Sequence, residues 1–418
     1  MKIKRIAIHS FRGIKELNLE FDDTQPTVLI GINGVGKSSI LDCMAILLSK
    51  FTSPVQYPTT SGRLFKEEDV SNGSNETHNE ITIVLDGKEI SWSLTKVQKR
   101  RNKDTISNLI ELKKLVEDTQ NQLRGNPQFN LPVVVHYAVN RAVIDIPLKM
   151  RKNVTFEPVV AYEQALNGVQ INFSNFFQWF RTLEDLENEE RRDDPNHLNP
   201  HLEAVRQAIY SALPGFSNLR IRRSPLRMTV TKNSREIIIN QLSDGEKCLL
   251  ALVGDLAWRF AIANPSLDEP RHGKGVVLID EIELHLHPKW QREIIPSLIR
   301  TFPNCQFIIT THSPQVLSHV QPEGIHILEN TETGIVVSGA ESSFGRDSNS
   351  ILEDLMEVPE RPQEIKDRLS ELFERIDDNN IEGARKLRQT LATQIGEDEP
   401  EFVRADVLIR RKEIMNQR

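Results

Sequence analysis

Cysteine, aromatic side chains and long apolar runs are all scarce in this chain. Among its 418 residues are three cysteines, Cys43, Cys248 and Cys305, which lie far apart and beside apolar residues. Their spacing argues against a disulfide framework or a cysteine metal site and predicts reduced core thiols. No apolar stretch reaches the length of a membrane-spanning helix, and the N-terminus starts directly with a strand pattern. We therefore expect a cytoplasmic protein that has no membrane partner.

The charge balance limits how much of the surface can contact nucleic acid. The formal net charge is −7, and aromatic residues make up 6% of the chain. This argues against a protein coated in nucleic-acid-binding surface but leaves room for a local basic groove. Residues 96–103 and the arginines of 219–227 are the two candidates. An ordinary solvated surface explains either segment at least as well, so the sequence does not decide whether DNA is a partner.

What the chain does contain is a complete phosphate-binding loop at residues 31–38, which fill every fixed position of GxxxxGK(S/T). The loop lies between the apolar run 27–30 and the helical run 39–48. A strand, a glycine-rich turn and a helix start together gather backbone N–H groups around an anion. Lys37 is expected to reach the β- and γ-phosphates of ATP, and Ser38 to bind Mg²⁺. The predicted ATP-binding residues of this loop are Asn33, Gly34, Gly36, Lys37, Ser38 and Ser39.

A second motif is an apolar strand, residues 275–279, that ends in the carboxylates of Asp280 and Glu281. The carboxyl ends of strands are where α/β sheets bind ligands. Asp280 is expected to orient Mg²⁺ or its water, and Glu281 to activate the attacking water as a general base. Solvated acids after a strand are common, so this motif gains its meaning from the others.

Two further motifs complete an ordered set. Residues 242–246 read LSDGE at a predicted helix start, where Ser243 and Gly245 suit an anion, and His312 follows the apolar strand 308–310. The four motifs in this order resemble the ATP-binding-cassette (ABC) ATPases of the SMC and RecF-like branch. The resemblance implies that Ser243, Gly245 and Glu246 close over the γ-phosphate bound by a second subunit, and that His312 is the switch histidine that touches it. ATP, Mg²⁺ and at least a homodimer follow from the same resemblance.

Two shorter stretches agree with that branch. Residues 2–8 alternate as a strand and lead into the turn 9–14, which contains Arg12. SMC- and RecF-like ATPases open similarly, which implies that Arg12 approaches the nucleotide; the alternative is an ordinary surface arginine. His285 and His287 belong to an HLHP stretch that resembles the D-loop region of OLD-like ATPases. Two histidines without a third ligand do not predict a metal site, so we expect subunit contacts there.

The sequence predicts an α/β fold of four segments. Residues 1–95 and 219–340 form the two parts of an ABC-type (RecF/SMC-like) P-loop ATPase, and residues 96–218 form a helical insertion lobe with an intervening strand. Residues 341–418 are predicted to be a helical tail for oligomerisation or partner docking. A cap that only stabilises the ATPase is the alternative. Apolar residues recur on one face of each tail helix and are expected to pack on the ATPase domain or on a partner; those of the first helix include Ile365, Leu369, Leu372 and Phe373.

The ending of the chain resembles a narrower group. Residues 345–352 read GRDSNSIL, and with the helical tail they resemble the RecF-like ATPase subunit of the Septu antiphage system and its retron-associated relatives. In that family the ATPase works with a separately encoded HNH endonuclease, and this chain shows no nuclease motif of its own. The resemblance implies an ATP-hydrolysing defence subunit that controls the nuclease. Two alternatives stay open: a RecF-like DNA repair or recombination ATPase, and an ATP-binding scaffold with negligible turnover.

Overall fold

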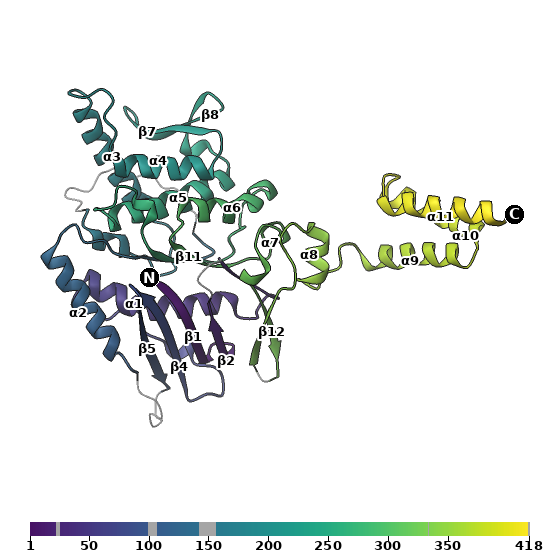
Figure 1. The fold of residues 1–418 in the computed structure, drawn as a ribbon, viewed down its shortest axis with the longest axis horizontal. Coiled ribbons are helices and arrows are strands. Elements are labelled where there is room, and N and C mark those ends of the chain that lie inside the picture. Colours follow the sequence, from purple (N-terminus) through teal and green to yellow (C-terminus); the bar gives the residue numbers. More distant parts are fainter. Residues whose placement is uncertain (22–25, 99–106, 142–155, 333, 417–418) are drawn as a thin grey trace. The chain divides into compact units, whose positions relative to one another are not determined.

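A computed structural model describes residues 1–21, 26–98, 107–141, 156–332 and 334–416 (Figure 1). Most of the basic run 96–103 lies outside the described residues. The chain forms two units, Met1–Ile351 and Leu352–Arg418. Within the described ranges, no helix combines the length and apolarity needed to cross a bilayer.

A six-stranded sheet forms the centre of the first unit. Its strand order is β13-β12-β3-β11-β10-β6, and all neighbours are parallel except the pair β12 and β13. Strands β3 and β10 are buried along their whole length, as their continuous apolar runs predict. The strands are β3 (Thr27–Ile30), β6 (Val133–Tyr137), β10 (Gly275–Ile279), β11 (Cys305–Thr310), β12 (Ile325–Thr331) and β13 (Gly334–Gly339).

The parallel order of this sheet brings four distant loops to one edge. Strands β3, β11, β10 and β6 are neighbours, so the segments that follow their carboxyl ends meet there. The P-loop follows β3, His312 follows β11, Asp280 follows β10 and Arg141 follows β6. The fold is therefore an α/β P-loop fold that brings the predicted motifs together.

Helices and a second sheet enclose the central sheet. Helix α1 starts at the P-loop and contacts β6, β10 and β11 (Figure 1). The helices of this unit are α1 (Lys37–Gln56), α2 (Ile110–Gly125), α3 (Phe173–Glu190), α4 (Pro200–Ala212), α5 (Asp244–Ala263), α6 (Pro288–Thr301), α7 (Pro314–Leu317) and α8 (Ser348–Asp354), whose last residues belong to the second unit. An antiparallel sheet of order β2-β1-β4-β5 contains β1 (Lys2–Phe11), β2 (Ile14–Glu20), β4 (Glu76–Leu85) and β5 (Lys88–Val97).

Asp86 and Gly87 form the hairpin turn between β4 and β5 that an Asp-Gly pair between two strand-like segments predicts. Strands β4 and β5 pair in antiparallel register up to Leu85 opposite Lys88. Asp86 and Gly87 both have positive φ, at 50° and 79°. That backbone is what a two-residue hairpin turn with an Asp-Gly sequence requires.

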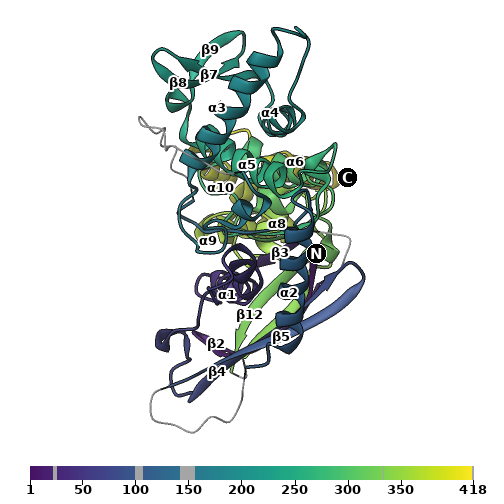
Figure 2. The same ribbon diagram turned by 90° about the vertical axis from the view of Figure 1, so that its left-hand side faces the viewer.

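The segment boundaries differ from the expected ones in two places. Strand β6 lies within the predicted insertion lobe, yet it pairs with β10 as the edge strand of the central sheet. Conversely, β7 (Phe216–Arg223), β8 (Leu226–Lys232) and β9 (Arg235–Ile238) form a separate three-stranded sheet instead of joining the central one. Strand β7 contacts helices α3 and α4 of the insertion (Figure 2). The insertion lobe thus combines helices with this sheet.

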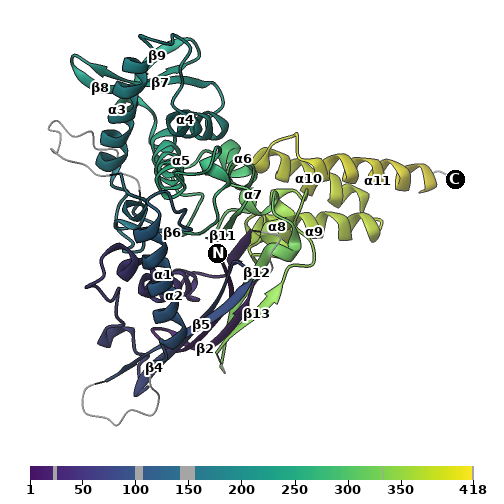
Figure 3. The same ribbon diagram turned by 60° about the vertical axis from the view of Figure 1, so that its left-hand side comes forward.

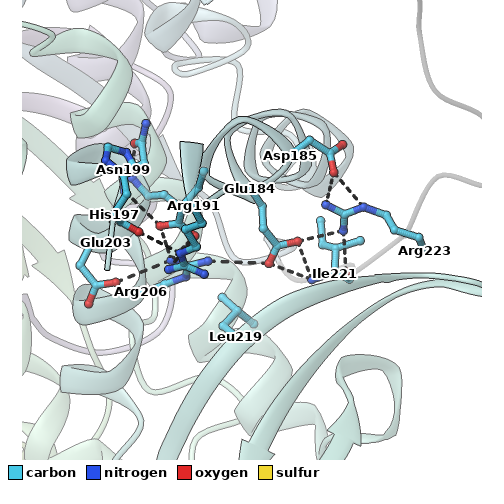
Figure 4. Close-up of polar contacts among 12 residues, drawn as sticks. Glu184, Asp185, Arg191, His197, Asn199, Glu203, Arg206, Leu219, Ile221 and Arg223 are labelled. Atoms are coloured by element: carbon cyan, nitrogen blue, oxygen red, sulfur yellow. Dashed lines mark hydrogen bonds and ion pairs between the residues drawn. The ribbon is translucent and has the colours of Figure 1, made fainter. Parts of the chain in front are cut away.

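Two carboxylates of α3, those of Glu184 and Glu187, connect this helix to the neighbouring α4 and β7 of the insertion lobe (Figure 4). Both oxygens of Glu187, which is 1% exposed, accept hydrogen bonds from Nη1 of Arg206 at 3.0 Å. Glu184 accepts from the backbone N–H of Ile221 and from Arg223 at 2.8 Å. Burial raises the pKa of Glu184 above its usual value, although these donors oppose the rise. Because a buried charge needs such partners, the network fixes α3 against α4 and β7.

The arginines of β7 are engaged by carboxylates. Arg220 and Arg222 both form ion pairs with Glu236 on β9, and Arg223 pairs with Asp185 as well as with Glu184. The Arg222 guanidinium lowers the pKa of Glu236 to about 2. This strand therefore carries much less uncompensated positive charge for a nucleic-acid phosphate than its sequence alone indicates.

The second unit contains a core of its own. It is built from α9 (Gln363–Asp377), α10 (Ile381–Ile395) and α11 (Pro400–Asn416), which pack on one another (Figure 3). Leu372, Ile376, Leu391 and Phe402 are completely buried at its centre. The apolar stripe of the first tail helix was expected to pack on the ATPase domain or on a partner. Instead, three amphipathic helices bury these faces against each other within residues 352–418.

Candidate ATP-binding site

The P-loop has the backbone that a phosphate cradle needs. Gly31 and Gly36 have φ of 144° and 112°, and a Cβ on Gly31 would lie 2.4 Å from the carbonyl oxygen of Leu328, so only glycine fits there. Nζ of Lys37 donates to the carbonyl oxygens of Gly31 at 2.8 Å and Ile32 at 3.0 Å. Because α1 begins at Lys37, its first amides have no preceding turn to bond and are available to an anion.

The surroundings of Lys37 identify the neighbours of the loop. Burial lowers the pKa of Lys37, while Asp280, Glu281 and Glu283 act in the opposite direction. These three carboxylates therefore lie within electrostatic reach of the ammonium group. The convergence of P-loop and carboxylates expected from the sequence is present in the fold.

Asp280 and Glu281 differ in their surroundings. Asp280 is 4% exposed, and its Oδ1 accepts a hydrogen bond from the Thr310 hydroxyl at 2.5 Å. Glu281 is half-buried, and within the described residues its carboxylate makes no hydrogen bond or ion pair. Its φ is +46°, a left-handed conformation that costs a non-glycine residue roughly 1 kcal/mol or more. An ionised carboxylate without a protein partner is free to accept a proton from water.

Ser38 and Asp280 suit a magnesium ion by their chemistry. Mg²⁺ takes oxygen ligands and usually keeps several waters, with one or two protein groups and the phosphates completing its shell. The hydroxyl of Ser38, on an exposed residue at the start of α1, and the carboxylate of Asp280 are such groups. Across the described ranges there is no cluster of three or more His, Cys, Asp or Glu side chains placed for a metal ion.

Two polar residues that were not predicted from the sequence, Glu283 and Thr310, organise the loop that contains His312. The carboxylate of Glu283 accepts hydrogen bonds from the backbone N–H of His312 at 2.5 Å and from the Thr311 hydroxyl at 2.8 Å. Glu283 thereby couples the segment after β10 to the segment after β11, and the imidazole of His312 stays half-buried and free of hydrogen bonds in the described part of the chain. Thr310 joins the same two segments through Asp280. The only sequence signal for Glu283 is its position two residues after Glu281.

Arg12 lies beside the loop but is committed elsewhere. The turn that contains it adjoins the P-loop, since a Cβ on Gly36 would lie 3.3 Å from Ile14. Its guanidinium, however, forms ion pairs with Asp42 on α1 and with Asp69. A direct approach to the nucleotide would require exchange of at least one of these partners. That role of Arg12 stays a prediction.

The LSDGE motif begins α5 and is internally bonded. One carboxylate oxygen of Glu246 accepts from the hydroxyl of Ser243 at 2.9 Å and from its N–H at 3.1 Å, and the other accepts from Lys232 on β8. Although burial opposes ionisation, these donors lower the pKa of Glu246 below its usual value. A Cβ on Gly245 would lie 2.6 Å from the carbonyl oxygen of His285, so the HLHP loop packs closely against the motif. A groove of about 800 Å³ is lined here by both segments.

Within one chain, the LSDGE motif and the P-loop bond to different neighbours. In the residues that the structure describes, no hydrogen bond or ion pair joins the LSDGE motif, residues 242–246, to the P-loop or to Asp280 and Glu281. Lys37 is influenced by the carboxylates after β10, whereas Glu246 is influenced by Lys232 and Ser243. Each chain therefore presents a P-loop half and an LSDGE half with different neighbours.

Residues 27–318 match the family described as "AAA domain, putative AbiEii toxin, Type IV TA system". The chain is 30% identical to the Retron Ec83 probable ATPase of Escherichia coli over 99% of its own length and 87% of the relative's. It is 25% identical to the Septu protein PtuA of Bacillus thuringiensis, covering 75% of this chain and 72% of that protein. Among solved structures, the SMC head domain from Thermotoga maritima is matched with a TM-score of 0.42 and 16% identity, covering 82% of this chain and 100% of that one.

The family match spans more than half of the chain and contains the P-loop, the LSDGE motif, Asp280, Glu281 and His312. The retron relative extends the likeness through the helical tail. This chain therefore belongs to the AAA domain family of that description and is related to the retron ATPases and to Septu PtuA.

Proposed function

We propose that this protein binds ATP with Mg²⁺ and hydrolyses it. The observation that carries the proposal is the carboxylate of Glu281, which has no partner among the described residues and follows β10 at the sheet edge where the P-loop follows β3. In this proposal Lys37 and the P-loop amides bind the phosphates, and Ser38 and Asp280 hold the metal ion. Glu281 accepts a proton from the attacking water, and His312 contacts the γ-phosphate. The family membership supports the same chemistry.

Hydrolysis in this proposal needs two copies of the chain. The P-loop and LSDGE halves have different neighbours within one chain, and Ser243 lies exposed at the start of α5. A helix start with an exposed hydroxyl is suited to an anion that a second copy delivers. Two copies facing each other would complete two composite sites by the same pair of contacts, as a two-fold axis requires.

In cells, the proposed role is an antiphage defence subunit that acts in the cytoplasm with a separately encoded HNH nuclease. The similarity to Septu PtuA and to a retron ATPase supports this role over a RecF-like repair function. ATP turnover would distinguish it from a scaffold that only binds nucleotide. The nuclease would dock on the assembled ATPase.

A phage challenge tests this role with one substitution. Cells that carry this gene together with the gene for the proposed HNH nuclease should survive infection, and Lys37→Ala should abolish survival because it removes the ammonium that binds the phosphates in this proposal. ATP affinity of the purified variant should fall in calorimetry. Lys114→Ala, at an exposed position in α2, serves as a matched control for the loss of one lysine. Full protection by Lys37→Ala at equal protein level would contradict the proposal.

Removal of the second unit tests the proposed docking role of the tail. Because residues 352–418 contain their own core, deletion after Asp354 should leave the first unit folded, with unchanged ATP affinity. We expect the truncated protein to elute as a smaller assembly in light-scattering chromatography and to lose the co-purified nuclease. Insolubility of the truncated protein would favour the cap alternative. An unchanged assembly that retains the nuclease would refute the docking role.

A further inference from the structure

The loop after β6 delivers a buried arginine to the turn that carries Glu281. Arg141 is 1% exposed. Its Nη1 donates to the carbonyl oxygen of Asp280, and its Nη2 donates to those of Glu281 at 2.7 Å and Ile282 at 3.2 Å. Among the described residues no carboxylate forms an ion pair with it. A buried guanidinium is usually paired with an acid, whereas this one is bonded to three consecutive carbonyls.

The opposite side of the same turn is held as well. The N–H of Asp280 donates to the carbonyl oxygen of Tyr137 at 2.9 Å, and the N–H of Glu281 donates to the hydroxyl of Thr310 at 2.8 Å. The N–H of Ile282 donates to the carbonyl oxygen of Thr310 at 3.1 Å. Glu281 adopts φ +46° between these two sets of bonds. Sparsely populated conformations persist only where the surroundings fix them, and among the described residues Arg141 supplies all the side-chain bonds on the carbonyl side.

We propose that Arg141 is a positioning residue for ATP hydrolysis, which holds Glu281 in the left-handed conformation that directs its carboxylate. The inference rests on the proposed ATPase function and deepens it. Arg141 bonds to the backbone of the carboxylate turn and to no residue of the P-loop. It therefore contributes to the rate of hydrolysis and leaves the affinity for ATP unaffected.

Substitution of Arg141 should separate kcat from ATP affinity. Arg141→Met keeps an unbranched side chain but removes all donors, so the turn can relax and Glu281 moves. Misplacement of a catalytic group by about 1 Å costs up to about a hundredfold in rate, and we expect kcat to fall at least tenfold by that argument. The dissociation constant for ATP, measured by calorimetry, should change by less than about twofold because the P-loop is intact. Arg141→Lys should recover part of kcat, since a single ammonium can serve only some of the carbonyls.

Arg206→Met is the matched control. It also removes a guanidinium, 11% exposed, but from the insertion lobe, where its ion-pair partners include Glu187. It should lower the melting temperature and leave kcat unchanged. Wild-type kcat in folded Arg141→Met, or an equal loss of affinity and rate, would overturn the inference.

A double variant keeps the test decisive if Arg141→Met does not fold. Combined with Glu281→Gln, Arg141→Lys should cause no further loss of rate, because both changes act through the same group. A multiplicative loss in the double variant would refute the positioning role. The wild-type rate is measured first. Absence of wild-type hydrolysis would overturn the proposed function together with this inference, whereas a wild-type rate in Arg141→Met would overturn this inference alone.

Discussion

Replacement of Glu281 by glutamine should leave ATP binding intact and reduce hydrolysis to a small residual rate. The amide has nearly the same shape as the carboxylate but cannot accept a proton, and the groups that bind phosphate and metal in the proposed site are untouched. General-base contributions are typically about a hundredfold or more, so we expect phosphate release to fall by at least that factor. ATP affinity in calorimetry should be equal or higher, because Glu281 also places a negative charge near Lys37 and the phosphates.

Glu293→Gln provides the control for this experiment. It makes the same change of charge at an exposed position in α6, and among the described residues the Glu293 side chain forms no hydrogen bond or ion pair. It should hydrolyse ATP at the wild-type rate. Unchanged turnover in Glu281→Gln would show that another group activates the water. Loss of ATP binding by Glu281→Gln would show that the carboxylate has a structural role.

Two inactive variants should restore activity when they are combined. Lys37→Ala destroys the P-loop half of a site, and Ser243→Arg blocks the LSDGE half. If each site is shared between two copies, a mixed dimer contains one site with both defects and one site with neither. Random pairing then restores up to about a quarter of the wild-type sites, by the symmetry of a two-fold dimer. Each variant alone should be inactive in the same phosphate-release assay.

The control for this mixture is a chain that carries both substitutions. When it is mixed with Lys37→Ala, no pairing yields an intact site, so no activity should return. Mixed oligomers are verified by two different affinity tags. If tagged mixtures form and remain inactive, the site is built within one chain, and the proposed sandwich is wrong.

The motifs of this site could be predicted from sequence because each is local. The P-loop, the LSDGE motif and the Asp280-Glu281 pair are short segments whose residue types determine their backbone or their chemistry. The parallel central sheet was also predictable, since continuous apolar runs such as residues 275–279 indicate strands buried on both faces. The Asp-Gly pair at residues 86–87 predicts the hairpin, and the helical spacing of apolar residues predicts the helices of the tail.

The supporting contacts could not be predicted because they join residues that are distant in the chain. Arg141 bonds to the carbonyl of Glu281 across 140 positions, and Glu283 bonds to the N–H of His312 across 29 positions. Nothing in the local sequence of either donor or acceptor indicates the pairing. The tail shows a related limit. Periodicity identified the apolar faces of its helices, but it could not indicate that these faces would cover one another.

The hydrogen bond from the Ser243 hydroxyl to Glu246 bears on ATP hydrolysis in the resting state. Cellular ATP is abundant at all times. An ATPase that should stay inactive therefore needs a resting state in which bound ATP alone does not close the composite site. Here the Ser243 hydroxyl already has an acceptor in Glu246, and a phosphate oxygen would replace that bond instead of adding one. Glu246 would keep Lys232 and the Ser243 N–H, so it would not be left unpaired. Such an exchange of hydrogen bonds changes the free energy by only about 1 kcal/mol. Closure would then depend on how often two copies of the chain meet. The concentration of the protein in the cell would therefore set the threshold for activity more than the concentration of ATP would.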